Sequence, residues 1–155
     1  MTATPLQMVR AMAAVANGGT LVTPHVVAQA DGRSFPLPST TIPVPRQDLD
    51  KVRAGMRGAV YSPGGTAFGT ALKSLPGTVY GKTGTAQPGG WWTPEPGPPK
   101  GVWHHWFVGF YEQPGRPTLA FACVLHARRE AAAGLTSAKA THEFLTWWAR
   151  HGWSE

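Results

Sequence analysis

The amino-acid sequence has little of several features that would place it in a common protein class. Its single cysteine, Cys123, excludes an intrachain disulfide framework and a cysteine-based zinc cluster. No apolar run approaches the roughly 18 residues that a membrane-spanning helix needs. Charged residues make up only 14% of the chain, against about 25% in an average domain. What is present, 42% hydrophobic residues and seven tryptophans in 155 residues, predicts a folded chain and excludes a wholly disordered one.

The charge pattern gives no sign of a nucleic-acid partner. The formal net charge is +6, but the basic residues are scattered singly or in pairs and form no patch. We therefore expect a sparsely charged basic surface and no nucleic acid among the partners. The first 20 residues lack a basic start and are interrupted by Pro5 and Asn17-Gly18-Gly19, so we expect this chain to carry no targeting signal of its own.

The clearest helix signal lies at the N-terminal end. Thr4 is a good N-cap residue, Pro5 suits the first helical position, and Gln7 can complete a capping box. Asn17-Gly18-Gly19 then predicts the end of this helix, because glycine tolerates the left-handed cap conformation.

Two more helices are predicted from apolar residues at helical spacing. One covers residues 46–60, and the other covers residues 135–151. The expected apolar stripe of the first is Leu49, Val52, Met56 and Val60. The expected packing face of the second is Ala138, Thr141, Leu145 and Trp148, with Phe144 and Trp147 beside it. A short extended piece over 21–27, a loop over 31–45 and a weak helix over 66–73 complete the N-terminal half.

Three segments carry strong strand signals: residues 78–87, 103–111 and 118–126. Pro114-Gly115 predicts a hairpin turn between the second and third of them. We therefore expect an α+β fold, with a three-stranded antiparallel sheet, a C-terminal helix across one face and helices on the N-terminal side. A Pro/Gly-rich loop is expected over 88–101.

The chemistry-bearing motif is Lys82-Thr83-Gly84-Thr85, inside the first strand. Gly81 and Gly84 are costly in a strand interior, so they predict close approach by a backbone or a ligand. Lys82 offers a cation for a carboxylate, the threonine hydroxyls offer hydrogen bonds, and an exposed backbone N–H can stabilise an oxyanion. A KTG triplet alone is a weak signal.

Four segments, in order, resemble the C-terminal half of the penicillin-binding transpeptidase domain of the peptidoglycan-crosslinking enzymes that β-lactams inhibit. These segments are TATPLQMVRAMAAVANGGTLVTPHVV (2–27), GGTA (64–67), VYGKTGTAQ (79–87) and HHWFVGFYE (104–112). The first is similar to class B penicillin-binding proteins, the third to the family's third signature box, and the fourth to the strand that pairs with that box. Serine β-lactamases share the KTG box, but the TPLQM and HHWFVGF segments look more like a transpeptidase.

The resemblance implies a role for each residue of the box. Lys82 matches the lysine that helps to polarise the site and to bind the acyl donor or β-lactam. Thr83 and Thr85 match residues that hydrogen-bond the ligand carboxylate, and Gly84 belongs to the same substrate-binding strand. The backbone N–H of Thr85 matches one of two oxyanion-hole donors, each worth about 3 kcal/mol in known acyl-transfer enzymes. We expect no metal and no other cofactor.

Two further motifs of the family's reaction do not occur in the sequence. No serine has a lysine three residues later, and the only asparagine, Asn17, follows Val15 by two, so there is no Ser-x-Asn. The missing serine would open the D-Ala-D-Ala amide to form an acyl-enzyme. We therefore expect residues 1–155 to be the C-terminal portion of a larger transpeptidase domain, inactive alone. The alternative is a catalytically silent module that binds stem peptide or β-lactam non-covalently.

The resemblance also implies the surroundings of the chain. In the intact domain two further strands come from the N-terminal half, so that half is an expected partner. Without it an exposed sheet edge promotes pairing, and we expect a homodimer through that edge. The expected ligand is a peptidoglycan stem peptide or a β-lactam. An intact member would be anchored at the cell membrane with this domain outside the cytoplasm.

Three other features have a structural and a functional interpretation. Adjacent strand residues point to opposite faces, so His104 and His105 do not predict a joint metal site. Trp91 and Trp92 could form an aromatic clamp over the substrate groove or pack on their own domain; the sequence leaves both open. Cys123 lies among apolar strand residues and is expected to be a buried small hydrophobe instead of a reactive thiol.

Overall fold

The computed structural model describes residues 3–27, 29–34, 37–86, 102–128 and 136–152. In chain order the elements are α1 (Pro5–Ala16), β1 (Thr20–Leu21), β2 (Gln29–Ala30), β3 (Arg33–Ser34), β4 (Thr40–Thr41), α2 (Arg46–Tyr61), the 3₁₀ helix η1 (Ala71–Ser74), β5 (Thr78–Ala86), β6 (Val102–Glu112), β7 (Leu119–Arg128) and α3 (Ser137–His151). The expected α+β class is confirmed. None of these helices is long and apolar enough to cross a membrane.

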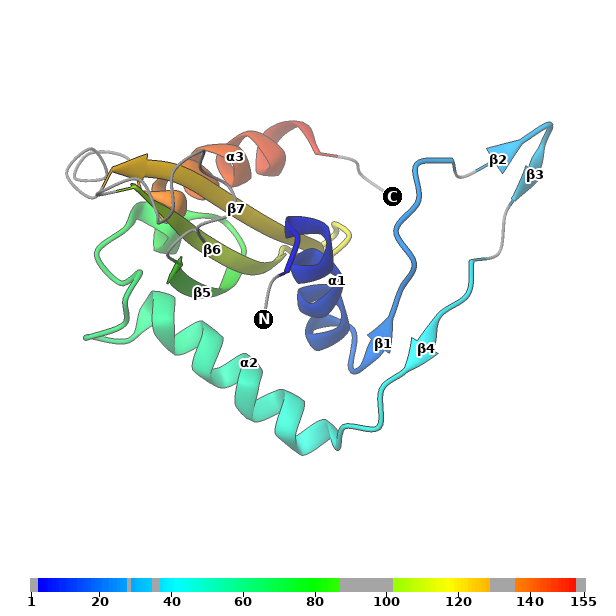
Figure 1. The fold of residues 1–155 in the computed structure, drawn as a ribbon, viewed down its shortest axis with the longest axis horizontal. Coiled ribbons are helices and arrows are strands. Elements are labelled where there is room, and N and C mark those ends of the chain that lie inside the picture. The colour runs from blue at the N-terminus through cyan, green and yellow to red at the C-terminus, as the bar shows by residue number, and fades with distance from the viewer. Residues whose placement is uncertain (1–2, 28, 35–36, 87–101, 129–135, 153–155) are drawn as a thin grey trace, which may run out of the picture.

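The three long strands form one antiparallel sheet in the order β5-β6-β7, as predicted (Figure 1). The predicted hairpin turn joins β6 to β7, where Arg116 N donates to Gln113 O at 3.1 Å. Gly115 has a φ of +74°, a left-handed conformation that glycine adopts at little cost. Within the described residues no strand pairs with the outer edge of β5 or of β7.

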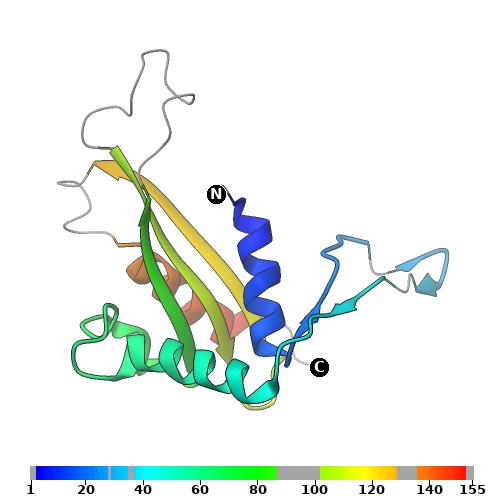
Figure 2. The same ribbon diagram turned by 60° about the horizontal axis from the view of Figure 1, so that its bottom comes forward.

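Helices cover both faces of this sheet (Figure 2). Helix α3 packs on β6 and β7 from one side, and α1 lies against the same two strands from the other side. The main core lies on the α3 side and also receives α2 and η1. Its buried members are Val60, Ala67, Leu72, Val79, Phe107, Tyr111, Phe121, Ala138 and Leu145. Each large apolar side chain among them stabilises the fold by about 1.5–3 kcal/mol relative to exposure.

The predicted start of α1 is confirmed in atomic detail. Thr4 Oγ1 accepts a hydrogen bond from Gln7 N at 3.2 Å, and Thr4 N donates to Gln7 Oε1 at 2.8 Å. Both halves of the capping box are therefore present, which satisfies two N–H groups at the helix start. Gly18 and Gly19 have positive φ values and follow the end of the helix, as expected.

The apolar stripe of α2 was predicted incorrectly at one position. Leu49, Met56 and Val60 are buried, but Val52 is 47% exposed. The next residue, Arg53, points inward instead, and its guanidinium lies 4.9 Å from the ring centroids of both Tyr80 and Phe110. The aliphatic part of an arginine side chain and its flat guanidinium can both pack on aromatic rings. This contact, and not the apolar spacing, determines which residue of α2 points inward here.

Helix α3 departs from its predicted packing face in the same way. Ala138, Thr141 and Leu145 are buried, and Trp148 packs against the core. Phe144 and Trp147, however, are 47% and 55% exposed. Their rings stack outside the core, and Trp147 also stacks on His151. The expectation that Trp147 packs inward is therefore wrong.

The segment between α1 and α2 is more ordered than the predicted loop over 31–45. It forms an arm that extends away from the sheet, with β1 paired to β4 and β2 paired to β3 (Figure 1). Asp31 and Gly32 both have positive φ, so they form the two-residue turn that closes a tight hairpin. Of the predicted extended piece over 21–27, only Leu21 lies in a strand, β1 (Thr20–Leu21).

Candidate functional site

The structure brings the predicted KTG residues together on an edge strand. The first half of β5 is anchored by the buried Val79 and Gly81, whereas Lys82, Gly84 and Thr85 are exposed and Thr83 is half-buried. An edge strand presents unpaired backbone N–H and C=O groups along its outer side. The motif is therefore placed where an extended ligand can reach both its backbone and its side chains.

Beside the motif lies a groove of about 300 Å³. Lys82 and Gly84 line it together with Trp106 and Val108 of β6 and Met8 of α1. The sheet register places Lys82 opposite Val108 and Gly84 opposite Trp106. The groove thus has an apolar floor and a cation on its rim, a combination that suits an anionic ligand with apolar groups.

Lys82 is available to such a ligand. Its Nζ donates to the backbone O of its neighbour Thr83 at 2.6 Å. Neither ion pair formed by the described residues involves Lys82. Because an ammonium group has three donors and this one is exposed, Lys82 can also bind a carboxylate without breaking an internal ion pair.

Gly81, next to the motif, and Gly84, within it, differ in what an added Cβ would contact. A Cβ at Gly81 would lie 2.6 Å from Phe107 Cε2 and closer still to Phe107 Cζ, so the ring occupies this space. The predicted close approach at Gly81 is therefore made by a core side chain, not by a backbone or a ligand. A Cβ at Gly84 would meet only Trp106 Cβ, at an ordinary 3.5 Å. Gly84 thus keeps the groove open without being required by packing.

Thr66, which lies outside the motif, contacts it. Thr66 Oγ1 lies 2.7 Å from Thr83 Oγ1, within hydrogen-bonding distance. Thr66 belongs to the GGTA segment, but sequence reasoning gave it no role. The weak helix predicted over 66–73 is also wrong: Thr70 is extended, and only Ala71–Ser74 forms a 3₁₀ helix. Turns replace the first part of that helix and present Thr66 to β5.

The histidines beside the motif occupy opposite faces of β6, as expected. His104 meets His126 of β7 edge-to-face, with ring centroids 4.8 Å apart. His105 is paired with Thr85 in the register, and its buried Nε2 has no hydrogen-bond partner among the described residues. No group of three or more His, Cys, Asp or Glu in the described ranges is arranged to hold a metal ion.

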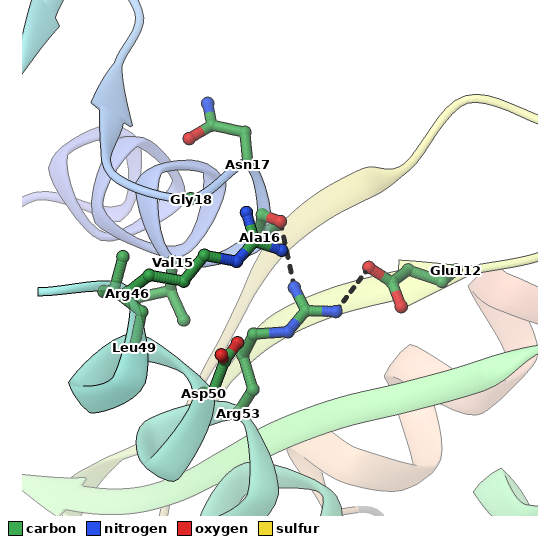
Figure 3. Close-up of a pocket in the computed structure, with 9 residues that line it drawn as sticks. All are labelled: Val15, Ala16, Asn17, Gly18, Arg46, Leu49, Asp50, Arg53 and Glu112. Carbon is green, nitrogen blue, oxygen red and sulfur yellow. Dashed lines mark hydrogen bonds and ion pairs between the residues drawn. The ribbon is translucent and has the colours of Figure 1, made fainter.

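A larger hollow, of about 410 Å³, lies at the other end of β5 and β6, where α1 ends beside α2 (Figure 3). Arg53 extends across it, donating to Ala16 O at 2.9 Å and pairing with Glu112 Oε1 at 2.8 Å. Burial lowers the pKa of Arg53, but Glu112 outweighs this effect and the pKa is raised. Arg53 thus joins the end of α1 to the end of β6 across this hollow, which lies away from Lys82.

Cys123 lies among apolar strand residues as predicted, but it is less buried than the sequence predicts. It is half-buried on β7, and burial raises the pKa of its thiol. The thiolate form is therefore scarce near neutral pH, and the side chain is not an activated nucleophile. The loop over 88–101, with Trp91 and Trp92, lies outside the described residues.

The fold and the site together define an α+β domain. Its edge strand β5 presents the ammonium group of Lys82 and two threonine hydroxyls beside a groove. The family model of the penicillin-binding protein transpeptidase domain matches residues 1–146 of this chain. The chain therefore belongs to the penicillin-binding protein transpeptidase domain family, as the resemblance indicated.

Two curated relatives are similar to this chain. Peptidoglycan D,D-transpeptidase MrdA of Salmonella typhimurium is 32% identical over 92 residues, which cover 55% of this chain and 15% of that protein. Penicillin-binding protein H of Bacillus subtilis is 31% identical over 142 residues, which cover 80% of this chain and 18% of that protein. The chain thus spans less than a fifth of the length of either relative.

Proposed function

We propose that this chain supplies the KTG wall of an acyl-serine active site in a peptidoglycan D,D-transpeptidase. A carboxylate of the stem peptide or β-lactam at the outer edge of β5 is bound by Lys82 from one face of the strand and by the hydroxyls of Thr83 and Thr85 from the other. The backbone N–H of Thr85 is one of two oxyanion donors. This function would be exercised outside the cytoplasm, where peptidoglycan lies.

The observation that carries the proposal is the placement of the motif. All four residues lie toward the end of an edge strand whose outer side is unpaired within the described residues, and Lys82, Thr83 and Gly84 line a groove with an apolar floor. An extended ligand can form hydrogen bonds with the backbone of this edge, while Lys82 and the threonines bind the terminal carboxylate of the ligand. Family membership and the D,D-transpeptidase relative support the same ligand class.

The chain by itself is proposed to bind without reacting. The acyl-transfer chemistry needs a serine whose proton is managed by nearby lysines, and the sequence contains no serine with a lysine three residues on. What this chain provides is recognition of the carboxylate and stabilisation of the developing oxyanion. The nucleophile would come from a separate half of the active site.

A fluorescent penicillin tests both parts of the proposal on the purified chain. We expect reversible binding by fluorescence anisotropy and no fluorescent band after denaturing electrophoresis. Lys82→Ala should weaken binding about tenfold, the usual loss for one charge-assisted hydrogen bond. Lys51→Ala, which removes an exposed lysine of α2, serves as the matched control and should bind like the native chain. Equal binding by Lys82→Ala, or a stoichiometric covalent band from the native chain, would contradict the proposal.

We also propose that the isolated chain forms a homodimer through an exposed sheet edge. Neither outer edge of the sheet is paired within the described residues, and open edges favour association with another strand. Light scattering at high protein concentration should give the mass of a dimer. A strictly monomeric mass would contradict this expectation.

A further inference from the structure

Thr66 is held in place by the residues on both sides of it. A Cβ at Gly65 would lie 2.5 Å from Ala59 O and 2.6 Å from Gly58 O, so only glycine fits against the end of α2. On the other side, Ala67 is fully buried and its N–H donates to Ala59 O at 2.9 Å. The backbone of Thr66 is therefore fixed to α2, and its side chain reaches the motif from a rigid support.

The Thr66 hydroxyl meets the motif at Thr83, the residue next to Lys82. The two Oγ1 atoms are 2.7 Å apart, and either hydroxyl can donate in this pair. Each threonine hydroxyl has one hydrogen and two lone pairs. One hydrogen therefore lies between the two oxygens, and the other hydroxyl keeps a hydrogen for a different acceptor.

A carboxylate ligand decides the direction of this bond. An ionised carboxylate can only accept hydrogen bonds, so Thr83 must donate its single hydrogen to it. Thr83 Oγ1 can then keep its bond to Thr66 only as the acceptor, with Thr66 as the donor. In the resulting chain, Thr66 to Thr83 to carboxylate, both bonds run the same way and each polarises the other.

We propose that Thr66 is a positioning residue that turns Thr83 into a hydrogen-bond donor for a ligand carboxylate. The inference rests on the proposed function, since it assigns Thr66 to the carboxylate recognition made there by Lys82 and Thr83. It deepens that function by naming a source of specificity. A ligand whose terminal carboxylate is replaced by an amide gains less from this arrangement, because its neutral oxygen is a weaker acceptor.

The first test needs no ligand. Nuclear magnetic resonance couplings report the χ1 angle of Thr83, which we expect to be a single rotamer in the native chain. In Thr66→Val, which keeps the shape but loses the hydroxyl, Thr83 should populate more than one rotamer, and Thr66→Ser should restore the single one. A single unchanged rotamer in Thr66→Val would overturn the proposal.

The second test compares an N-acylated D-Ala-D-Ala with its C-terminal amide, titrated against each variant. Thr66→Val should lower affinity for the acid about fivefold, the usual effect of one hydrogen bond, and leave the amide nearly unchanged. Thr66→Ser should recover the preference, and Thr40→Val, at an exposed threonine of the distant arm, should match the native chain. An equal loss for both ligands would overturn the proposal.

The two tests also separate this inference from the proposed function. If the native chain binds neither ligand, the proposed function fails, and the rotamer measurement alone decides whether Thr66 positions Thr83. If the native chain binds the acid and Thr66→Val binds it equally well, the proposed function stands and the role of Thr66 falls.

Discussion

Replacing Gly81 by alanine should destabilise the fold through one identifiable clash. The added Cβ would lie 2.6 Å from Phe107 Cε2, and Phe107 is a fully buried member of the main core. The ring cannot move toward solvent, so the strand or the core must shift. Gly81 is also paired with Gly109, where an added Cβ would strike the Tyr80 carbonyl, so the backbones of β5 and β6 approach closely at this pair.

The size of the effect follows from two opposing contributions. Overpacking a buried site costs about 1–3 kcal/mol, and we take the upper value because the overlap is severe. Alanine recovers about 1 kcal/mol because it restricts the unfolded chain more than glycine does. The expected net loss in the free energy of unfolding is about 2 kcal/mol. For a chain of this length, that corresponds to a fall in Tm of about 4–8 °C.

Urea denaturation followed by tryptophan fluorescence measures this loss, and Gly84→Ala is the matched control. At Gly84 the new Cβ would make only an ordinary 3.5 Å contact with Trp106 Cβ. We therefore expect Gly84→Ala to unfold within about 0.5 kcal/mol of the native chain. Adding Phe107→Leu to Gly81→Ala should cost less than the sum of the single changes. Equal stability of the two alanine variants would refute the packing argument.

Two further predictions concern stability away from the motif. Arg53→Met should lower the free energy of unfolding by about 1.5–3 kcal/mol, because it removes a charge-assisted bond and leaves a half-buried Glu112 unpaired. Glu112→Gln, whose amide oxygen can still accept from Arg53, should cost less, and the reverse order in urea denaturation would contradict the assignment. Stability should also fall as the pH rises past the ordinary thiol value of about 8.5. Burial raises the pKa of Cys123 in the folded chain, so the unfolded chain loses its proton first, and the stability gained from the protonated thiol is lost above that pH. Cys123→Ala should show a smaller fall between pH 7 and pH 10 in the same assay, and an equal fall would contradict this prediction.

Local chemistry determines the parts of the fold that the sequence predicts well. The capping box at Thr4, the Pro114-Gly115 turn and the alternating strands depend on neighbouring residues, and all three are found in the structure. The three long strands were placed within one or two residues of their observed bounds. These are the features for which sequence spacing and backbone geometry are directly linked.

The errors arise where tertiary contacts override local pattern. Val52 fits an apolar stripe, but Arg53 takes the inward position because it packs on two aromatic rings and pairs with Glu112. Trp147 is apolar enough for a core, yet the helix rotation that buries Leu145 leaves it outside. Neither outcome is visible from helical spacing alone, since spacing identifies a face but not the partner opposite it.

The residues of the candidate site were predicted from the sequence, but the contact that Thr66 makes with them was not. The KTG residues were located from the motif, and the structure places them at an exposed strand edge. The contact of Thr66 with Thr83 joins residues 17 positions apart, so no local pattern announces it. The GGTA segment was a usable signal, because its adjacent glycines and threonine precede the motif and mark a tight turn.

The central claim is that the exposed end of β5 is the ligand-binding surface, and a map of amide chemical shifts tests it most directly. On titration with an N-acylated D-Ala-D-Ala, we predict shifts that saturate and centre on Lys82, Thr83, Gly84 and Thr85, and that need about tenfold more ligand to reach half-saturation in Lys82→Ala. Shifts centred instead on the hollow around Arg53, or shifts that persist unchanged in Lys82→Ala, would contradict the account.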